Sequence, residues 1–508
     1  MHHGGCDPGG IGPMPLCMAW EPINGRRDMR NILPQSCVSL LPCCYGGRTG
    51  RFRQAFPACE MADIFAGTVT QRHSRANLAI RKARRAPDME CVMHVVVIGA
   101  GVIGMSTAWA LARDGHRVTV LEAGPEPATG TSHANGAQLS YSYVAPLANP
   151  GIWADLPKLL FGPGAAVRFR PGLDLQQYRW GLQFLRACNT DMARSTIQAL
   201  LRLAFLSRDI LSNAGDIAGL DFDHVQAGKL VVYSDAASLQ AAAGLAQYQN
   251  TLGCQQQVLD RDGCLAREPA LRHMGHRITG GIYTPDDAAG DPYKLCLGLA
   301  GLLGGHNGGV DFRFNTRVIS LLRAGNRIGG VETEAGIVQG DAYVLAGGLD
   351  SRALALPIGI DLPIYPIKGY SFTLDVADEA EAPRVSITDY ANKIVYARLG
   401  NRLRIAGMAD IVGADHSLDS SRVQQLERQA GEAFKLPPGP RRAWCGLRPA
   451  TPTGRPVLGA SGLENLWLNV GHGALGFTLA FGSAAVIAAL LGQREAPVPL
   501  ADFALHAA

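Results

Sequence analysis

The stretch that decides the fold is His94–Glu122, HVVVIGAGVIGMSTAWALARDGHRVTVLE. Its first apolar run ends in three spaced glycines, Gly99, Gly101 and Gly104. An alanine-rich segment follows, and a second apolar run ends at Glu122. This order predicts a strand, a glycine turn, a helix, a second strand and an acid, as in a dinucleotide-binding unit.

Each glycine has a physical role in that interpretation. Gly99 permits a tight turn, Gly101 lets the backbone approach a pyrophosphate, and Gly104 lets the helix pack closely on the strand. The helix N-terminus would face the phosphates with free N–H groups, and Glu122 could accept hydrogen bonds from ribose hydroxyls. An ordinary strand-turn-helix unit is the alternative, but the ordered surroundings favour a dinucleotide site. The glycines alone leave the identity of the dinucleotide open.

Composition excludes some classes of partner. A chain of 508 residues can hold two or three domains, and 47% hydrophobic with 18% charged residues is typical of a globular protein. The net charge of +4 comes from residues 1–93, which hold 12 basic and 7 acidic residues; the remainder holds 35 and 36. The body of the protein is therefore not basic, and its charge suggests no nucleic-acid partner.

The cysteines show no metal-binding pattern. Neither a CxxC nor a Cys/His ligand spacing occurs, so no metal site is predicted. Scattered cysteines without a predicted signal peptide indicate reduced thiols and a cytoplasmic protein. Seven of the twelve precede the first strand, and the five after it are Cys188, Cys254, Cys264, Cys296 and Cys445.

Residues 1–90 differ from the rest. They mix glycine, proline, arginine and cysteine without helical or strand periodicity, which predicts a disordered N-terminal extension. No basic start followed by an unbroken apolar core indicates a secretory signal. We expect translation to begin at Met89 or Met93, in which case the residues before that methionine would not belong to the native protein. N-terminal sequencing of natively expressed protein tests this expectation.

Three later stretches are informative. Residues 123–140, AGPEPATGTSHANGAQLS, could supply hydrogen-bond donors to a ligand near the glycine turn or form a plain solvent loop. A strand running into paired glycines at Val344–Gly348 indicates another crossover at a nucleotide site. Leu475–Leu491 is mostly apolar but shorter than the about 20 residues that span a bilayer. Because this stretch also contains Gly476 and Gly482, we predict a buried helix.

An ordered set of motifs carries a family resemblance over residues 93 to about 503. The chain resembles the FAD-dependent amino-acid oxidoreductases of the D-amino-acid oxidase superfamily, most closely the small subunit of bacterial D-amino-acid dehydrogenases. The motifs are VVVIGAGVIGMSTAWAL, TSHANGAQLS, SYVAPLANPGI, PIYPIKGYSFTL, RIAGMADIVG, GLRPATPTGRPVLG and NLWLNVGHGALGFTLAFGS.

The resemblance implies an α/β protein in which a Rossmann-like FAD-binding domain is interleaved with a substrate domain built on an antiparallel sheet. It implies an FAD-binding domain of residues 91–150, 285–355 and 441–508, and a substrate-binding domain of residues 151–284 and 356–440. The two domains would therefore each be assembled from separate parts of the chain.

The resemblance also implies that FAD is the cofactor. The glycine turn would hold the pyrophosphate and Glu122 the ribose. The loop residues would lie beside the pyrophosphate and flavin, Val318 and Gly347 near the adenosine, and the turn after His472 would place a helix N-terminus at the flavin ring, where negative charge develops on reduction. The implied cofactor residues are Gly99, Ala100, Gly101, Val102, Ile103, Gly104, Glu122, Ser132, Asn135, Gln138, Val318, Gly347, Gly473, Leu475 and Gly476.

Four residues are candidates for binding the substrate or for its chemistry. Arg448 matches the arginine that related oxidases use for the substrate carboxylate, since a guanidinium binds a carboxylate with two hydrogen bonds; the alternative is a structural arginine bonded to backbone carbonyls. Tyr370, and less so Lys368, could line the pocket. His472 could be catalytic or a packing histidine. His133 departs from the small or apolar residue expected in the motif TSxAN.

The implied reaction is hydride transfer from the α-carbon of a D-amino acid to flavin, giving an imino acid that hydrolyses to a 2-oxo acid and ammonia. The implied acceptor is a quinone, with peripheral contact at the inner face of the membrane. The alternatives are an oxygen-dependent oxidase of glycine, sarcosine or proline-type amino acids, a non-catalytic flavoprotein and an NAD-dependent dehydrogenase. The sequence leaves the side-chain preference and the oligomeric state open.

Overall fold

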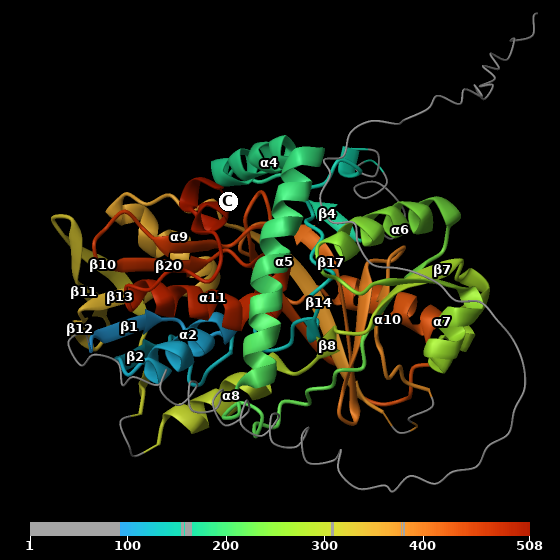
Figure 1. Ribbon diagram of the computed structural model, residues 1–508, viewed down its shortest axis with the longest axis horizontal. Coiled ribbons are helices and arrows are strands. Elements are labelled where there is room, and N and C mark those ends of the chain that lie inside the picture. The colour runs from blue at the N-terminus through green and yellow to red at the C-terminus, as the bar shows by residue number, and fades with distance from the viewer. Residues whose placement is uncertain are drawn as a thin grey trace, which may run out of the picture. The chain divides into compact units, whose positions relative to one another are not determined.

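The computed structural model describes residues 92–153, 157, 165–305, 309–376, 378 and 381–507. All of them belong to the unit Arg84–Ala508. Two sheets organise this unit, one drawn on the left and one on the right of Figure 1. The expectation for residues 1–90 falls outside the described residues.

The first sheet has six strands in the order β19-β20-β13-β1-β2-β9. All neighbouring pairs are parallel except β19–β20. The strands come from three separate parts of the chain: β1 (His94–Ile98), β2 (Arg117–Leu121), β9 (Asp311–Arg313), β13 (Ala342–Leu345), β19 (Val457–Ala460) and β20 (Leu466–Val470).

Both faces of this sheet are covered, which explains the continuous apolar runs of its strands. Val95 and Val97 of β1 join one core, and Val96 and Ile98 join another. The helices of the first core are α2 (Val102–Arg113), α5 (Thr190–Asn213), α8 (Pro292–Leu303) and α11 (Gly476–Leu491). The second core is closed by α9 (Ser351–Ala355) and by a small sheet of β10 (Val318–Ala324), β11 (Arg327–Thr333) and β12 (Gly336–Val338).

Helix α11 packs against α2 and α5. The rings of Trp109 and Phe481 meet edge to face at 5.3 Å, and a Cβ at Gly482 would lie 2.5 Å from the carbonyl oxygen of Leu203. Among the described residues, only Gly473–Leu491 is long and apolar enough to cross a membrane. Most of this segment, 72%, is buried inside the structure. The prediction of a buried helix is confirmed.

The second sheet is larger and mainly antiparallel, in the order β18-β14-β17-β16-β15-β5-β7-β6, with β4 paired to β17. The pairs β15–β5 and β17–β4 are parallel. Its strands are β4 (Val167–Phe169), β5 (Lys229–Tyr233), β6 (Gln257–Asp260), β7 (Gly280–Thr284), β14 (Tyr365–Asp375), β15 (Ser386–Asp389), β16 (Ile394–Leu399), β17 (Arg402–Ile411) and β18 (Arg442–Ala450).

Shorter elements complete this part. A ribbon of β3 (Gln138–Leu139) and β8 (Ala288–Ala289) is separate from both sheets. Four further α-helices are fully described in the structure: α4 (Leu175–Ala187), α6 (Ala236–Thr251), α7 (Arg261–Arg267) and α10 (Ser420–Ala433). Helix α10 contacts β14 and β17.

The α/β class, with a Rossmann-like domain and an antiparallel sheet, is confirmed. The third segment of the expected FAD-binding domain, residues 441–508, begins with a strand of the second sheet. In that strand, Arg442–Ala450 pairs with β14 as the edge strand of the large sheet. The second sheet therefore extends to Ala450, immediately before the chain returns to the first sheet.

Candidate functional site

The glycine turn joins β1 to α2. Gly99 has φ +104°, a conformation that side chains rarely adopt, and its N–H donates to the carbonyl of Leu121 at 2.8 Å. A Cβ at Gly99 would lie 2.8 Å from the carbonyl oxygen of Ala346, and a Cβ at Gly104 would lie 1.8 Å from that of Gly99. Backbone therefore fills the space that a side chain would need at both positions.

The N-terminus of α2 is covered by the segment that follows β2. Ser132 is buried, and its Oγ accepts a hydrogen bond from the N–H of Val102 at 3.0 Å. The N–H of Ala128 donates to the carbonyl of Ala100 at 3.0 Å. Gly101 precedes the helix in extended backbone, and its Cβ position is 3.5 Å from the Ser132 Oγ. Ala100 to Gly104 and Ser132 thus form one cradle at the positive end of a helix dipole.

Glu122 is bonded directly to this cradle. One carboxylate oxygen accepts from the N–H of Ala100 at 2.7 Å, and the other accepts from the N–H of Gly124 at 2.8 Å. The carbonyl of Glu122 accepts from Thr316, two residues before Val318. Gly347 is also close, because its Cα is 3.0 Å from the Cβ position of Gly99. The structure therefore brings Glu122 and Gly347 to the glycine turn, and Val318 follows Thr316, which bonds the backbone of Glu122.

A second helix N-terminus, that of α11, follows a buried histidine. His472 pairs with Ala450, the last residue of β18, and its carbonyl accepts from the N–H of Leu475 at 3.0 Å. Gly473–Leu475 forms a single 3₁₀ turn, and α11 begins at Gly476. Within the described part of the chain, the Nε2 of His472 has no hydrogen-bond partner. Burial lowers the pKa of His472 to about 3, so the imidazole is neutral at physiological pH.

This shift predicts a pH-dependent stability. Because the unfolded histidine takes up a proton near pH 6.5 and the folded one only near pH 3, His472 costs stability as the pH falls between these values. Between pH 6.5 and pH 4, the free energy of unfolding should therefore fall by about 3 kcal/mol less in His472→Gln than in the parent protein. Denaturant unfolding at a series of pH values measures this. If the free energy of unfolding depended on pH in the same way in both proteins, His472 would take up its proton in the folded protein as readily as in the unfolded one.

The loop Thr131–Ser140 connects the two helix ends. Ser132 bonds the first turn of α2, and the N–H of Ser140 donates to the Oγ1 of Thr478 in the first turn of α11 at 3.0 Å. Between them, the Asn135 side chain accepts from the N–H of Ala137 at 2.8 Å and fixes the turn. The expected solvent-loop alternative does not describe this segment, since one loop contacts both helix N-termini.

Gln138 is held by the large sheet. Its Nε2 donates to the carbonyl of Ile387 at 3.1 Å, and its Oε1 accepts from the Nζ of Lys229 at 2.8 Å. Lys229 is 2% exposed and also donates to the Oγ of Ser140 at 2.8 Å. Burial lowers the pKa of Lys229 and raises that of the neighbouring buried carboxyl of Asp287. The sequence gives no indication that Lys229 is buried beside this loop, because the lysine is simply the first residue of strand β5.

Arg448 lies on β18 and faces the same loop. Its register partner on β14 is Ile367, so it shares a face with Gly369 and Ser371. The Oγ of Ser371 donates to the carbonyl of Ala134 at 2.6 Å, and the Oγ1 of Thr131 donates to that of Leu447 at 2.7 Å. Arg448 is therefore carried on the sheet face that packs against the loop of the cofactor cradle.

The guanidinium of Arg448 lies flat over a glycine. A Cβ at Gly369 would be 2.3 Å from its Nη2, and Nη1 donates to the carbonyl of Met408 at 3.0 Å. A bond to a backbone carbonyl is what a purely structural arginine would make. It occupies only one of the five N–H donors of the guanidinium. No carboxylate of the described residues forms an ion pair with Arg448, and burial lowers its pKa despite the opposing charge of Asp410. The remaining donors suit an anionic ligand.

Tyr370 and Lys368 lie on the other face of β14. Their register partners are Cys445 and Leu447, which alternate with the positions that share the face of Arg448. The Tyr370 hydroxyl donates to Asp410 at 3.1 Å, and Lys368 bonds Asp415 and the carbonyl of Ser417. Successive side chains of a strand point to opposite faces of the sheet. Tyr370 therefore lies on the face opposite to Arg448, which argues against a place for Tyr370 in the same pocket.

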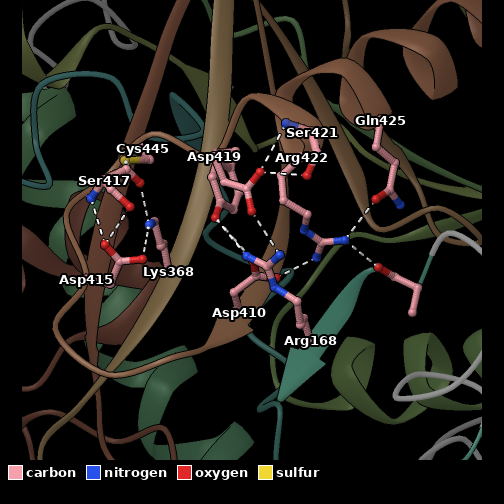
Figure 2. A network of polar contacts seen from close by, with 12 residues as sticks. Arg168, Lys368, Asp410, Asp415, Ser417, Asp419, Ser421, Arg422, Gln425 and Cys445 are labelled. Carbon is pink, nitrogen blue, oxygen red and sulfur yellow. Dashed lines mark hydrogen bonds and ion pairs between the residues drawn. The ribbon is translucent and has the colours of Figure 1, made fainter. Parts of the chain in front are cut away.

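The buried Asp410, which accepts from Tyr370, is the centre of an ion network with Arg168 and Arg422 (Figure 2). Asp410 accepts from Arg168 at 2.6 Å and from Arg422 at 2.5 Å as well as from Tyr370, and Arg168 also pairs with Asp419 at 2.9 Å. Burial and the Asp410 carboxylate raise the pKa of Tyr370. The network joins β4, β14, β17 and the start of α10.

We therefore expect Tyr370→Phe to act on stability. Loss of its hydrogen bond to a buried carboxylate should lower the free energy of unfolding by about 1 to 2 kcal/mol, while the KM for a substrate carboxylate changes by less than about twofold because Arg448 is untouched. Tyr396→Phe is the matched control, since the buried Tyr396 hydroxyl has no partner within the described residues. A large rise in KM for Tyr370→Phe alone would return Tyr370 to the substrate site.

His133 contacts aromatic rings at the outer side of the loop. Its ring centroid is 4.8 Å from that of Tyr293 and 6.5 Å from that of Trp444. The Trp444 ring in turn lies over Gly446, where a Cβ would be 1.9 Å from it. The unexpected histidine thus joins the loop to β18 beside Arg448.

Known proteins are similar to this chain over most of its length. The model of the FAD dependent oxidoreductase family matches residues 94–490. The chain is 47% identical over 429 residues to D-amino acid dehydrogenase 2 of Ralstonia nicotianae, covering 81% of this chain and 100% of that protein. It is 46% identical over 409 residues to D-amino acid dehydrogenase 2 of Pseudomonas aeruginosa, covering 79% and 95%.

Solved structures share the fold. Glycine oxidase from Geobacillus kaustophilus superimposes with a TM-score of 0.65 at 21% identity, covering 81% of this chain and 98% of that one. L-proline dehydrogenase from P. horikoshii gives 0.62 at 17% identity, covering 82% and 97%. With the family model matching most of its length, the chain belongs to the FAD-dependent oxidoreductases.

Proposed function

We propose that this protein oxidises D-amino acids to 2-oxo acids and ammonia and passes the electrons to a quinone-type acceptor. Its curated relatives at 47% and 46% identity are named D-amino acid dehydrogenases. The observation that carries the proposal is Arg448, a half-buried arginine without a carboxylate partner among the described residues, on the sheet face that packs against the cofactor loop.

The residues present fit FAD. The glycines at positions 99, 101 and 104 bring β1 and the N-terminus of α2 close together, and the N–H groups and dipole of a helix N-terminus favour a pyrophosphate. The orphaned Nε2 of His472 is a buried polar atom beside the N-terminus of α11, and such an atom suits a polar edge of a bound ring. When bound, FAD accepts the hydride of the substrate and so supplies the redox chemistry.

The chain's own residues supply orientation and electrostatics. Arg448 would bind the substrate carboxylate with two parallel hydrogen bonds and so fix the α-carbon. The N-terminus of α11 would stabilise negative charge that develops near it. Neutral His472 can exchange hydrogen bonds but carries no charge at physiological pH. No side chain has to act as a strong base if the substrate amine arrives uncharged.

Anaerobic mixing with a panel of amino acids tests the proposal. We expect D-amino acids to bleach the flavin absorbance and their L-enantiomers to leave it unchanged. Bleaching by glycine, sarcosine or proline alone would overturn the substrate class. With a D-amino acid as donor, a quinone should be reduced stoichiometrically, whereas hydrogen peroxide formed in proportion to substrate would instead identify an oxidase. Flavin that no amino acid bleaches would indicate a protein without turnover.

A further inference from the structure

A surface around α4 exposes an unusual number of large apolar side chains. We call it the α4 surface. Seven of the sixteen exposed large hydrophobic residues in the described part of the chain lie between residues 147 and 182, and Leu173 and Leu175 are 103% and 83% exposed. Scattered single residues of this kind need no explanation, but a cluster marks an interaction site. The α4 surface comprises Trp153, Phe169, Leu173, Leu175, Tyr178 and Leu182.

Helix α4 carries apolar side chains on its exposed face as well as on its buried face. Leu175, Tyr178 and Leu182 are three and four residues apart, so they share one face, and that face is exposed. The opposite face holds Trp180, which is buried and stacks on Phe184 at 5.3 Å. The helix is therefore fixed by its inner face while its outer face presents apolar side chains to the surroundings. In Figure 1, α4 lies at the upper edge of the molecule.

Neighbouring segments are bonded to α4. The Tyr178 hydroxyl donates to the carbonyl of Gly172 at 2.8 Å, and the Gln177 amide donates to the carbonyl of Arg170 at 3.0 Å. The indole of Trp153 donates to the carbonyl of Cys188, immediately after α4, at 3.3 Å. The exposed residues before and after the helix thus belong to one fixed surface.

Basic residues accompany these apolar ones. Arg170 and Arg186 are exposed, and neither has an ion-pair partner in the described ranges. Arg179, on the outer side of α4, pairs with Asp361 at 2.5 Å. Asp174 is the N-cap of the helix, where its side chain accepts from the N–H of Gln176. Arginines beside exposed Leu, Trp and Tyr side chains are the composition of a helix that lies in the interface of an anionic bilayer.

The α4 surface is also next to the proposed active site. The Trp180 indole donates to the carbonyl of Ala450 at 2.9 Å. Ala450 is the last residue of β18, two positions after Arg448, and pairs with His472. The inner face of α4 therefore rests on the end of the strand that carries the substrate arginine.

We infer that the α4 surface docks on the interfacial layer of a membrane that contains anionic lipid. The apolar side chains enter the boundary between headgroups and acyl chains, and Arg170 and Arg186 contact the lipid phosphates. This inference rests on the proposed function, because docking would bring the electron-donating site to a quinone dissolved in the bilayer. The surface itself is defined by exposure and charge, independently of the reaction.

Vesicle binding tests the inference with the full-length holoprotein. We expect co-sedimentation with vesicles of phosphatidylcholine and phosphatidylglycerol, and weaker binding to phosphatidylcholine alone. The triple variant Leu175→Ser, Tyr178→Ser, Leu182→Ser should bind at least about tenfold more weakly, and Arg170→Gln with Arg186→Gln should remove the preference for anionic vesicles. The matched control is Val258→Ser, Ile319→Ser, Ile337→Ser, which removes three exposed apolar side chains elsewhere and should bind as the parent does.

Equal binding by parent and α4 variant would overturn the inference. So would a parent that is oligomeric in solution and becomes monomeric in the α4 variant without any vesicle binding, since the surface would then contact a second copy. A kinetic arm separates this inference from the proposed function. The α4 variant should reduce a soluble dye at the parental rate with a D-amino acid as donor, but reduce a long-chain quinone in vesicles at least about tenfold more slowly. Absence of dye reduction in the parent would reject the proposed reaction and leave the vesicle result standing.

Discussion

Replacing Arg448 by alanine is expected to raise the KM for D-amino acids by about 30- to 3000-fold while FAD stays bound. Loss of one partner of a buried, hydrogen-bonded charge pair costs about 2 to 5 kcal/mol, and each 1.4 kcal/mol is about a factor of ten. The cofactor cradle should be unaffected, because the side chain of Arg448 hydrogen-bonds only to the Met408 carbonyl among the described residues. Anaerobic flavin reduction at a series of substrate concentrations measures the effect.

Two further variants sharpen this result. Arg448→Lys keeps the charge but loses the planar pair of donors, so it should recover only part of the affinity. Arg442→Ala is the matched control, since Arg442 is an exposed arginine of the same strand that pairs with Asp375 at 2.8 Å. It should leave the KM unchanged. If Arg448→Ala behaves like this control, Arg448 is a structural residue that holds the backbone at Met408.

Gly104→Ala is expected to remove FAD from the purified protein. The added Cβ would lie 1.8 Å from the carbonyl oxygen of Gly99, which is backbone and cannot rotate away. Either α2 shifts off β1 or the glycine turn opens, and both displace the N–H groups that face the pyrophosphate. We expect at least about a tenfold loss of bound flavin and a fall of about 3 kcal/mol in the free energy of unfolding. Flavin content per chain and denaturant unfolding measure the two effects.

The control for this variant is Gly244→Ala. Gly244 also lies inside a helix, α6, but nothing is within 4 Å of its Cβ position. This substitution should leave the flavin in place and stabilise the helix slightly, because alanine has the higher helix propensity. A flavin content in Gly104→Ala equal to that of Gly244→Ala would show that the close approach of α2 to β1 is not needed for the cofactor.

The parts of the fold that depend on local patterns could be predicted from the sequence. The strand, turn and helix around Gly99 follow from apolar runs and glycine spacing, and α11 follows from an apolar stretch that begins directly after a glycine turn and contains Gly476 and Gly482. Strand pairing between distant segments is not a local property. The motif around Arg448 adjoins the last segment of the first sheet in sequence, yet its residues pair with β14 in the other sheet.

The side on which a residue lies depends on register. Tyr370 and Arg448 are on neighbouring strands, and a shift of one residue would have put them on the same face. The burial of Lys229 could not be predicted either, because its partners Gln138 and Ser140 come from a loop about ninety positions earlier in the chain. The exposed face of α4 is also invisible to periodicity, which shows that a helix has an apolar side but not which side is buried.

The loop Thr131–Ser140 has a consequence for thermodynamics. It bonds the N-terminus of α2 through Ser132, that of α11 through Ser140, and the face that carries Arg448 through Thr131 and the Ala134 carbonyl. A cofactor held at the helix ends and a substrate held at Arg448 would therefore act on the same stretch of backbone. If FAD strengthens substrate binding by ordering this loop, the substrate must strengthen FAD binding by the same factor, because the coupling free energy is shared.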